Sequence, residues 1–413
     1  MQLTIHYIKS SGQSEASAPA TQGEAVAVPE PSELAIRYHR SGNVLWAAET
    51  GLGLLIPALL LFSGMSARLR TLAERVGRRW LATVALYALL FTLLTALLTL
   101  PVAYYAGFLR QHEYGLSNQT FGRWMGEWLK GSGVSAIGLS LVLWIPYFLL
   151  RLSAARWWLY AGVATVPLTT VLLVISPIWV DPIFNDYGPM KDKALEARIV
   201  ALARRAGIGK SRVYQVNKSI DTRAVNAYVT GFGGSKRIVL WDTSVGKLTG
   251  DQIVFVTAHE MGHFVLRHTL AVILGATILT TTSLYVVHRL AGGLIGRFSS
   301  RFGFQRLSDV ASFPLLLLLG GVVSLILAPG VMAFSRYQER EADRFALEIT
   351  RNNRAAAATF VRLQEENLAV PRPGSLYMLW RGSHPALGDR IDFANRYRPW
   401  GSGDKLRYQH LFK

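Results

Sequence analysis

The sequence of 413 residues contains no cysteine. Disulfide bonds and thiolate metal ligands are therefore excluded, and cysteine usage says nothing about the compartment. Acidic residues are scarce as well, with 26 Asp and Glu against 44 Lys and Arg, which gives a net charge of +18. None of the known nucleic-acid recognition motifs accompanies this charge, so we expect no nucleic-acid partner. Residues 1–43 lack the apolar core of a signal peptide and are rich in small and polar residues, which predicts a disordered N-terminal tail.

Apolar residues, in contrast, are abundant. Hydrophobic residues make up 51% of the chain and its mean hydropathy is +0.25, which is high for a soluble protein of this size. Six segments have the length of about twenty apolar residues that crosses a bilayer. They are residues 44–65, 80–108, 134–150, 157–180, 269–288 and 312–334. The sequence therefore predicts a polytopic α-helical membrane protein with the lipid bilayer as a partner. Basic residues near the span ends are balanced between the two sides, so the positive-inside rule does not decide the orientation.

The most informative motif is His259-Glu260-Met261-Gly262-His263. Residues four apart lie on one face of a helix, so the two histidines can bind one metal ion while Glu260 lies beside it. Thr249 and Gln252 have the spacing of a capping box, which predicts a helix that begins just before the motif. Two histidines and an adjacent carboxylate are the arrangement that a zinc hydrolase requires. The alternative is a surface helix on which the histidines only form ordinary hydrogen bonds.

The polar part of the chain is divided in two. The last two spans, residues 269–334, separate residues 181–268 from residues 335–413, whereas the first four spans lie together in residues 44–180. Two β-rich runs, 224–230 and 237–241, flank a Gly-Gly turn and predict a hairpin. We therefore expect a mainly α protein with a small α+β zincin-type metallopeptidase domain that is split by a transmembrane hairpin. No helix breaker separates the metal motif from the fifth span, so we expect one continuous helix and a metal about 9 Å from that span.

A catalytic zinc site needs a third protein ligand. Glu339 and Asp343 share one face of a predicted helix after the sixth span, whereas Glu341 points elsewhere. By spacing alone, Glu341 and Glu348 compete with Glu339 for this role. An alternative without a metal is a solvated acidic face that pairs with neighbouring basic residues. These neighbours are Arg336, Arg340 and Arg344.

Residues 335–343, SRxxExxAD, resemble the third-ligand motif of the type I CAAX prenyl endopeptidases, which are integral membrane zinc proteases. Four further stretches resemble this family in the same order along the chain. They are the helix with the two histidines, residues 114–120 (YGLSNQT), residues 226–228 (NAY) with Gly231, and residues 383–385 (SHP) with Arg390 and Ile391. The resemblance extends from about the first span to Arg390.

This resemblance implies roles for individual residues. His259, His263 and Glu339 would bind one Zn²⁺, Glu260 would act as the general base, and Asp343 would orient a ligating histidine.

Residues outside the metal cluster also receive roles from the resemblance. Asn226, Ala227 and Tyr228 would lie on an edge strand that pairs with an extended substrate. His384 and Arg390 would stabilise the oxyanion that forms on the peptide carbonyl. The alternatives are that Asn226 is only a turn residue at the strand end and that His384, before a proline, only ends a loop.

The resemblance implies an integral membrane zinc metalloendopeptidase that cleaves near the C-terminus of prenylated, CAAX-type substrates. It also implies an active site that faces the cytoplasm, in a bacterial-type inner membrane or an endoplasmic reticulum-like membrane. A quality-control protease for membrane proteins remains an alternative, as does a catalytically silent transporter or chaperone, for which Glu49 is almost the only charged candidate within a span. Eukaryotic family members resemble a seven-helix barrel around a chamber, whereas this chain offers six clear spans.

Overall fold

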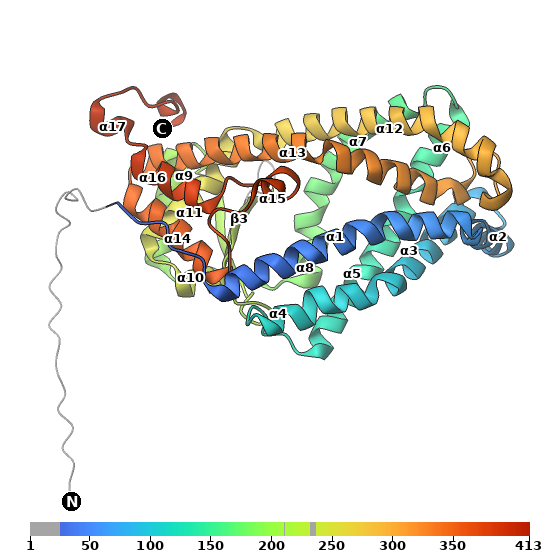
Figure 1. The fold of residues 1–413 in the computed structure, drawn as a ribbon. Coiled ribbons are helices and arrows are strands. Elements are labelled where there is room, and N and C mark those ends of the chain that lie inside the picture. Colours follow the sequence, from blue (N-terminus) through green and yellow to red (C-terminus); the bar gives the residue numbers. More distant parts are fainter. Residues whose placement is uncertain (1–24, 210, 232–236) are drawn as a thin grey trace, which may run out of the picture.

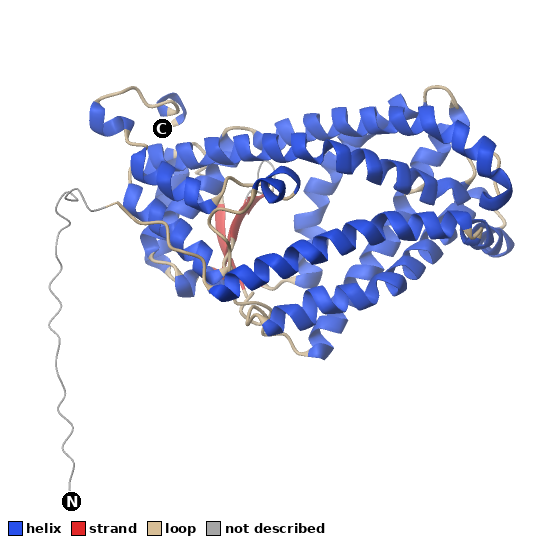
Figure 2. Ribbon diagram, viewed as in Figure 1, coloured by secondary structure: helices blue, strands red, loops and turns tan. Residues whose placement is uncertain are grey.

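The computed structural model describes residues 25–209, 211–231 and 237–413, and it is mostly helical (Figure 1). Within this part of the chain, six helices are long and apolar enough to cross a membrane. They are Glu33–Phe62, Trp80–Glu113, Phe121–Leu152, Trp157–Phe184, His268–Phe302 and Val310–Thr350. A small sheet and short helices gather at the opposite end of the molecule from α2 (Figure 2). The prediction of a polytopic α-helical protein with a small mixed domain is therefore confirmed.

The first four spans, together with one short helix between the first two, consist of several helical pieces. These are α1 (Glu33–Phe62), α2 (Met65–Gly77), α3 (Trp80–Tyr104), α4 (Arg110–Glu113), α5 (Phe121–Val142), α6 (Trp144–Leu152), α7 (Trp157–Ile175) and α8 (Asp181–Phe184), with π-helical turns at Tyr105–Leu109 and Ser176–Val180. Tyr87 and Tyr147 are fully buried between the spans. Their hydroxyls form hydrogen bonds with the hydroxyls of Ser66 and Ser312, at 2.7 and 3.0 Å, so neither polar tip is left unpaired in an apolar region.

The first span begins earlier than the apolar run predicts. Ser32 caps α1 by accepting a hydrogen bond from the Ala35 amide at 3.1 Å, and Glu33 occupies the first turn. The prediction of a disordered tail is therefore wrong for residues 33–43, which form the polar start of this helix. Residues 1–24 of that tail lie outside the described residues. The third span is also longer than predicted, because it begins at Phe121 in a polar turn that Thr120 caps.

The polar segment before the fifth span contains the sheet. Its elements are β1 (Tyr187–Pro189), α9 (Lys193–Arg205), β2 (Arg212–Val216), β3 (Ala227–Thr230), β4 (Arg237–Trp241), α10 (Asp242–Lys247) and α11 (Gly250–Val265). The strand order is β1-β2-β4-β3, in which β2 and β4 are parallel and the other pairs antiparallel. The predicted hairpin is confirmed by the pairing of β3 with β4, although its connection at 232–236 lies outside the described residues. Strand β3 forms one edge of the sheet.

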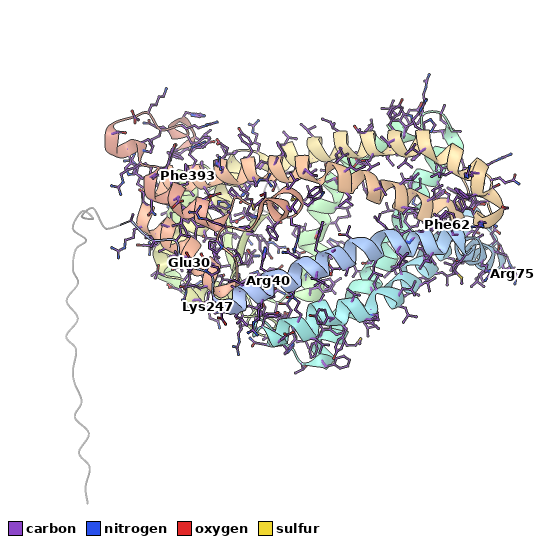
Figure 3. All side chains as sticks on the ribbon, viewed as in Figure 1. Glu30, Arg40, Phe62, Arg75, Lys247 and Phe393 are labelled. Atoms are coloured by element: carbon purple, nitrogen blue, oxygen red, sulfur yellow. The ribbon has the colours of Figure 1, made fainter. Side chains whose placement is uncertain are left out.

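The C-terminal part begins with the last two spans. It comprises α12 (His268–Phe302), a 3₁₀ turn (Val310–Ser312), α13 (Phe313–Thr350), α14 (Asn353–Glu366), α15 (Ser375–Trp380), α16 (Leu387–Arg396), α17 (Pro399–Ser402) and a 3₁₀ turn (Gln409–Leu411). Helix α13 runs from the spans into the mixed domain. Labelled Phe62 and Arg75 mark the far end of the molecule, and Lys247 and Phe393 mark the end that contains the sheet (Figure 3).

Helices α11 and α13 pack closely at the metal motif. A Cβ atom on Gly262 would lie 3.2 Å from Phe345 Cδ1 and 3.3 Å from Ala342 Cα, closer than most side chains tolerate. Phe255 on α11 packs edge-on against Phe360 on α14, with ring centroids 5.5 Å apart, and both side chains are buried. The core of the mixed domain therefore holds the motif helix in register with α13.

The motif helix does not continue into the fifth span, so that prediction is wrong. Helix α11 ends at Val265, Arg267 has a left-handed backbone with φ of 58°, and α12 begins at His268. No glycine or proline announces this break in the sequence. Its structural consequence is that His268 returns to the motif, where its Nδ1 lies 2.9 Å from His263 Nδ1.

Candidate metal centre

Three side chains from two helices converge on one point. His259 and His263 lie one turn apart on α11, and their Nε2 atoms are 3.2 Å from each other. Glu339 on α13 lies opposite, with Oε2 3.2 Å from His259 Nε2 and Oε1 3.3 Å from His263 Nε2. One ligand atom from each of the three residues lies within 4.8 Å of the others. The capping box of Thr249 and Gln252, which the sequence predicts, starts the helix that carries both histidines.

The donor set fits a metal ion. Oε2 of Glu339 is buried and receives no hydrogen bond from any described residue, although two imidazole nitrogens lie within 3.3 Å of it. Such an arrangement is costly for neutral hydrogen-bonding groups and suits a shared cation. Two imidazoles and one carboxylate form a recurrent ligand set of catalytic zinc, which leaves a fourth position for water or substrate.

Asp343 contacts the ring nitrogen of His259 that does not face Glu339. Its Oδ1 lies 2.9 Å from His259 Nδ1, and Arg390 on α16 binds the same carboxylate through two hydrogen bonds of 2.6 and 2.8 Å. Burial alone would lower the pKa of His259, but the carboxylates of Asp343 and Glu339 raise this pKa to about 10. The carboxylates thus favour a positive charge at His259, which is the charge that a metal cation would supply.

Glu260 lies beside the cluster of His259, His263 and Glu339. It lines a cavity of about 380 Å³ together with His259, His384 and Arg390. Burial raises the pKa of Glu260 because its charged form loses hydration there, although neighbouring histidines oppose the shift. A carboxylate with a raised pKa is a stronger base, so the position suits proton transfer from a water in the cavity.

The competing acidic residues have other partners. Glu341 binds Arg344 and the Tyr408 hydroxyl, and its Oε2 lies 3.1 Å from Arg407 Nη2. Glu348 accepts hydrogen bonds from the Tyr397 hydroxyl and from the amides of Arg407 and Tyr408, the latter two at 3.0 and 2.8 Å. Neither carboxylate lies in the cluster formed by the two histidines and Glu339.

The expectation of a solvated acidic face is not met. Arg336 donates hydrogen bonds to the carbonyls of Met378 and Gly382 rather than to an acid. Glu339 is 7% exposed and Asp343 is 2% exposed, so both are buried. This leaves Glu339 as the acidic residue on α13 that meets the two histidines.

The residues expected to bind substrate divide into two groups. Asn226 and Ala227 line the same cavity as Glu260, at the start of edge strand β3. Tyr228 points elsewhere, because its hydroxyl lies 2.9 Å from that of Tyr187. The main chain of Asn226 is fixed by Ser244, whose Oγ accepts from the Asn226 amide at 2.8 Å and donates to its carbonyl at 2.7 Å.

His384 and Arg390 differ in their freedom to move. The His384 side chain is 55% exposed, and its Nε2 lies 3.3 Å from Glu339 Oε2. Arg390 is buried and tied to Asp343, while it still lines the cavity. His384 can therefore turn towards a ligand in the cavity, whereas Arg390 is held in place.

Residues 114–120 attach the membrane part to the loop before β3. Asn118 Nδ2 donates to the Ser219 carbonyl at 2.9 Å, and Gln119 Nε2 donates to Asp221 Oδ1 at 3.1 Å.

His268 is a neighbour of the site that the sequence did not predict. The contact of its Nδ1 with His263 Nδ1 depends on the chain break at Arg267, so only its nearness in sequence to the motif could have suggested it.

Comparison with known proteins decides the family. Residues 189–398 match the model of peptidase family M48, and residues 22–186 match the model described as CAAX prenyl protease N-terminal, five membrane helices. An uncharacterized metalloprotease of Bacillus subtilis, YhfN, is 37% identical over 91% of this chain and 88% of its own length. The chain belongs to peptidase family M48.

Other members of this M48 branch agree with that assignment. A CAAX prenyl protease 1 homolog of Dictyostelium discoideum is 28% identical over 90% of this chain and 86% of its own. The crystal structure of Ste24p from S. mikatae shares the fold, with a TM-score of 0.77, 22% identity and 88% coverage of both chains. The resemblance drawn from the sequence motifs is thus confirmed, and the protein is a multi-pass membrane metalloprotease. A transporter or a silent chaperone is not supported.

Proposed function

We propose that this protease is a zinc endopeptidase that cleaves near the C-terminus of membrane-associated, prenylated substrates. The observation that carries the proposal is the convergence of His259, His263 and Glu339 beside Glu260, in a cavity that is also lined by the start of edge strand β3. The relatives named CAAX prenyl proteases suggest the substrate class. The helix with the two histidines lies directly before the fifth span, and the sixth span continues into the helix that contains Glu339. This position near the bilayer suits a substrate whose lipid chain stays in the apolar phase.

His259, His263 and Glu339 would hold the zinc ion, and Asp343 would fix the ring of His259. When bound, zinc supplies Lewis-acid polarisation of a carbonyl and lowers the pKa of water. Glu260 takes a proton from the attacking water and delivers it to the leaving amine.

The walls of the cavity would position the peptide. The edge of β3, at Ala227 and Tyr228, would pair with an extended peptide. Asn226 would position this edge, because its amide and carbonyl are bonded to Ser244. His384 donates a hydrogen bond to the oxygen that becomes negative, and Arg390 adds positive charge from the same side of the cavity.

The first test is Glu260→Gln. The amide cannot accept the proton, so peptide cleavage should fall by about 1,000-fold while bound zinc stays at the wild-type level. Glu74→Gln, at the far end of the molecule, is the matched control and should behave as wild type. Near-normal cleavage by Glu260→Gln would refute the proposed general base.

The second test concerns the lipid. A quenched farnesyl peptide and its unlipidated twin are compared in one detergent, with and without a chelator. Faster, chelator-sensitive cleavage of the farnesyl peptide supports the prenyl substrate class. Equal cleavage of the two would instead favour a quality-control protease without prenyl specificity.

We further propose that the active site faces the cytoplasm. Because the chain has no cysteine, single substitutions provide clean labels. Ser402→Cys on α17 and Ser63→Cys at the far end of α1 should differ in their reaction with a membrane-impermeant maleimide added outside sealed cells. Labelling of Ser402→Cys alone would place the active site outside and contradict the proposal.

A further inference from the structure

A second cavity adjoins the catalytic one. It has a volume of about 300 Å³ and lies between α1, α4, α15 and the segment that joins α14 to α15. Asn367 and Ala369 line both cavities, so they form a shared wall. The two cavities therefore adjoin at these two residues.

Two arginines face the same point of this second cavity. A Cβ atom on Gly42 would lie 3.1 Å from Arg110 Nη2 and 3.8 Å from Arg381 Nη2, so the glycine allows both guanidinium groups to approach the same point of α1. Arg110 is 5% exposed, and it is fixed by hydrogen bonds to Ser41 Oγ at 3.0 Å and to the Tyr38 carbonyl at 2.6 Å. The positive charges are held in place rather than free in solvent.

Neither guanidinium has a carboxylate partner in the described part of the chain. Arg381 donates to the neutral side chain of Asn43 and stacks over the ring of Tyr377, 4.8 Å from its centroid. Glu49 lines the same cavity but forms no ion pair with either arginine. Arg110 is buried and Arg381 is half-buried. A charge withdrawn from water without a counter-ion is costly, so these two charges at one cavity indicate a site for an anion.

The edge strand indicates which end of a substrate reaches this site. A peptide that pairs antiparallel with β3 runs past Ala227 towards Val225 with its C-terminal end. The Val225 amide donates to Asn367 Oδ1 at 3.2 Å, and Asn367 belongs to the shared wall. The C-terminal residues of such a peptide would point towards the second cavity, and the anion that every peptide with a free C-terminus carries is its terminal carboxylate.

We propose that Arg110 and Arg381 bind the C-terminal carboxylate of the peptide substrate. This inference rests on the proposed function and adds to it the substrate group that fixes the position of cleavage, which is the terminal carboxylate. Cleavage would then occur at a fixed distance from the chain end, because about 3.3–3.6 Å of extended chain separates successive residues. The site would favour peptides with a free terminus over internal loops.

The experiment compares two peptides of identical sequence, one with a free C-terminal carboxylate and one with a C-terminal amide. The zinc-loaded, full-length enzyme in phosphatidylcholine micelles should cleave the free acid with a kcat/KM roughly 30-fold higher, as expected for loss of one charge pair in a partly exposed pocket. In Arg381→Gln and in Arg110→Gln this acid-to-amide ratio should fall towards one. Arg68→Gln, an exposed arginine on α2, should keep the wild-type ratio.

The outcomes separate this inference from the proposed function. A wild-type ratio near one, or variants that lose activity on both peptides in proportion, would overturn the carboxylate site while leaving the protease intact. No chelator-sensitive cleavage of either peptide would instead count against the proposed function. Phosphatidylglycerol added to the micelles tests a lipid phosphate as the anion: if Arg381→Gln changed only the response to this lipid, the carboxylate proposal would fail.

Discussion

Two faces of α13 use buried acidic residues for opposite purposes. Glu339 and Asp343 face α11, whereas Glu341 and Glu348 face the C-terminal segment, and all four are at most 7% exposed. On the first face, the partners are three histidines and one arginine, so the cluster can accept a cation. On the second face, arginines, tyrosine hydroxyls and main-chain amides already satisfy the carboxylates.

The difference indicates that the partners of a buried acid, more than its burial, determine whether it is available to a cation. Glu339 keeps one oxygen without a hydrogen bond from the described residues, and Glu348 accepts bonds on both oxygens. Each hydrogen-bond donor directs a positive hydrogen at the oxygen, so an oxygen surrounded by donors is a less favourable ligand for a cation. The two faces should therefore respond differently when a single acid is removed.

The largest expected effect is that of Glu339→Gln. The amide keeps the volume but is a poor metal ligand, so zinc should be lost during purification and peptide cleavage should fall by about 1,000-fold or more. Zinc is measured per chain by elemental analysis. Glu341→Gln, on the other face of the same helix, is the matched control and should retain about one zinc. Equal zinc loss in both variants would break the comparison.

A smaller effect is expected for Asp343→Asn. The change removes the negative charge that orients His259 and that binds Arg390, so zinc affinity should fall by about 10- to 100-fold. The affinity is measured by competition with a chromogenic chelator. If the affinity were unchanged, His259 would be positioned by its helix alone.

The sequence predicts those features that local periodicity encodes. Six apolar runs mark the spans, Thr249 and Gln252 start the motif helix, and a Gly-Gly turn between β-rich runs marks the hairpin. The spacing of four between Glu339 and Asp343 likewise predicts their shared face. Each of these signals lies within a few residues of the feature that it predicts.

Features that depend on distant partners could not be predicted in this way. The helix breaks at Arg267 although no glycine or proline occurs there. The break brings His268 to His263, a contact that local sequence does not signal. Glu348 remained a candidate ligand because its partners, Tyr397 and the amide of Tyr408, come from a C-terminal segment without a periodic pattern. The family motifs supplied the choice that spacing alone left open.

The second face should contribute to stability rather than to metal binding. In Glu348→Gln an NH₂ group replaces one acceptor oxygen opposite main-chain amides, which should lower the free energy of unfolding by about 2 kcal/mol. Thermal unfolding in detergent measures this loss, and proteolysis should become faster near residues 397–408. The zinc content should stay unchanged; zinc loss at wild-type stability would contradict the assignment of the two faces.

Asp242 provides the smallest effect and sharpens the comparison, because it has partners like those of Glu348 but is partly exposed. Burial would raise its pKa, but hydrogen bonds from the Ser219 hydroxyl and from the amides of Ser219, Lys218 and Thr243 lower it. A lowered folded-state pKa means that the charged carboxylate stabilises the fold above the ordinary value of 3.8 and that this stability is lost as the pH falls through the folded value. Wild type should therefore melt about 2 °C above Asp242→Asn at pH 6, and the difference should shrink below pH 3.8. A melting-temperature difference that grew on acidification would mean that the hydrogen bonds favour the protonated form of Asp242. The contrast between the two faces of α13, which assumes that such partners favour the charged carboxylate, would then lose its support.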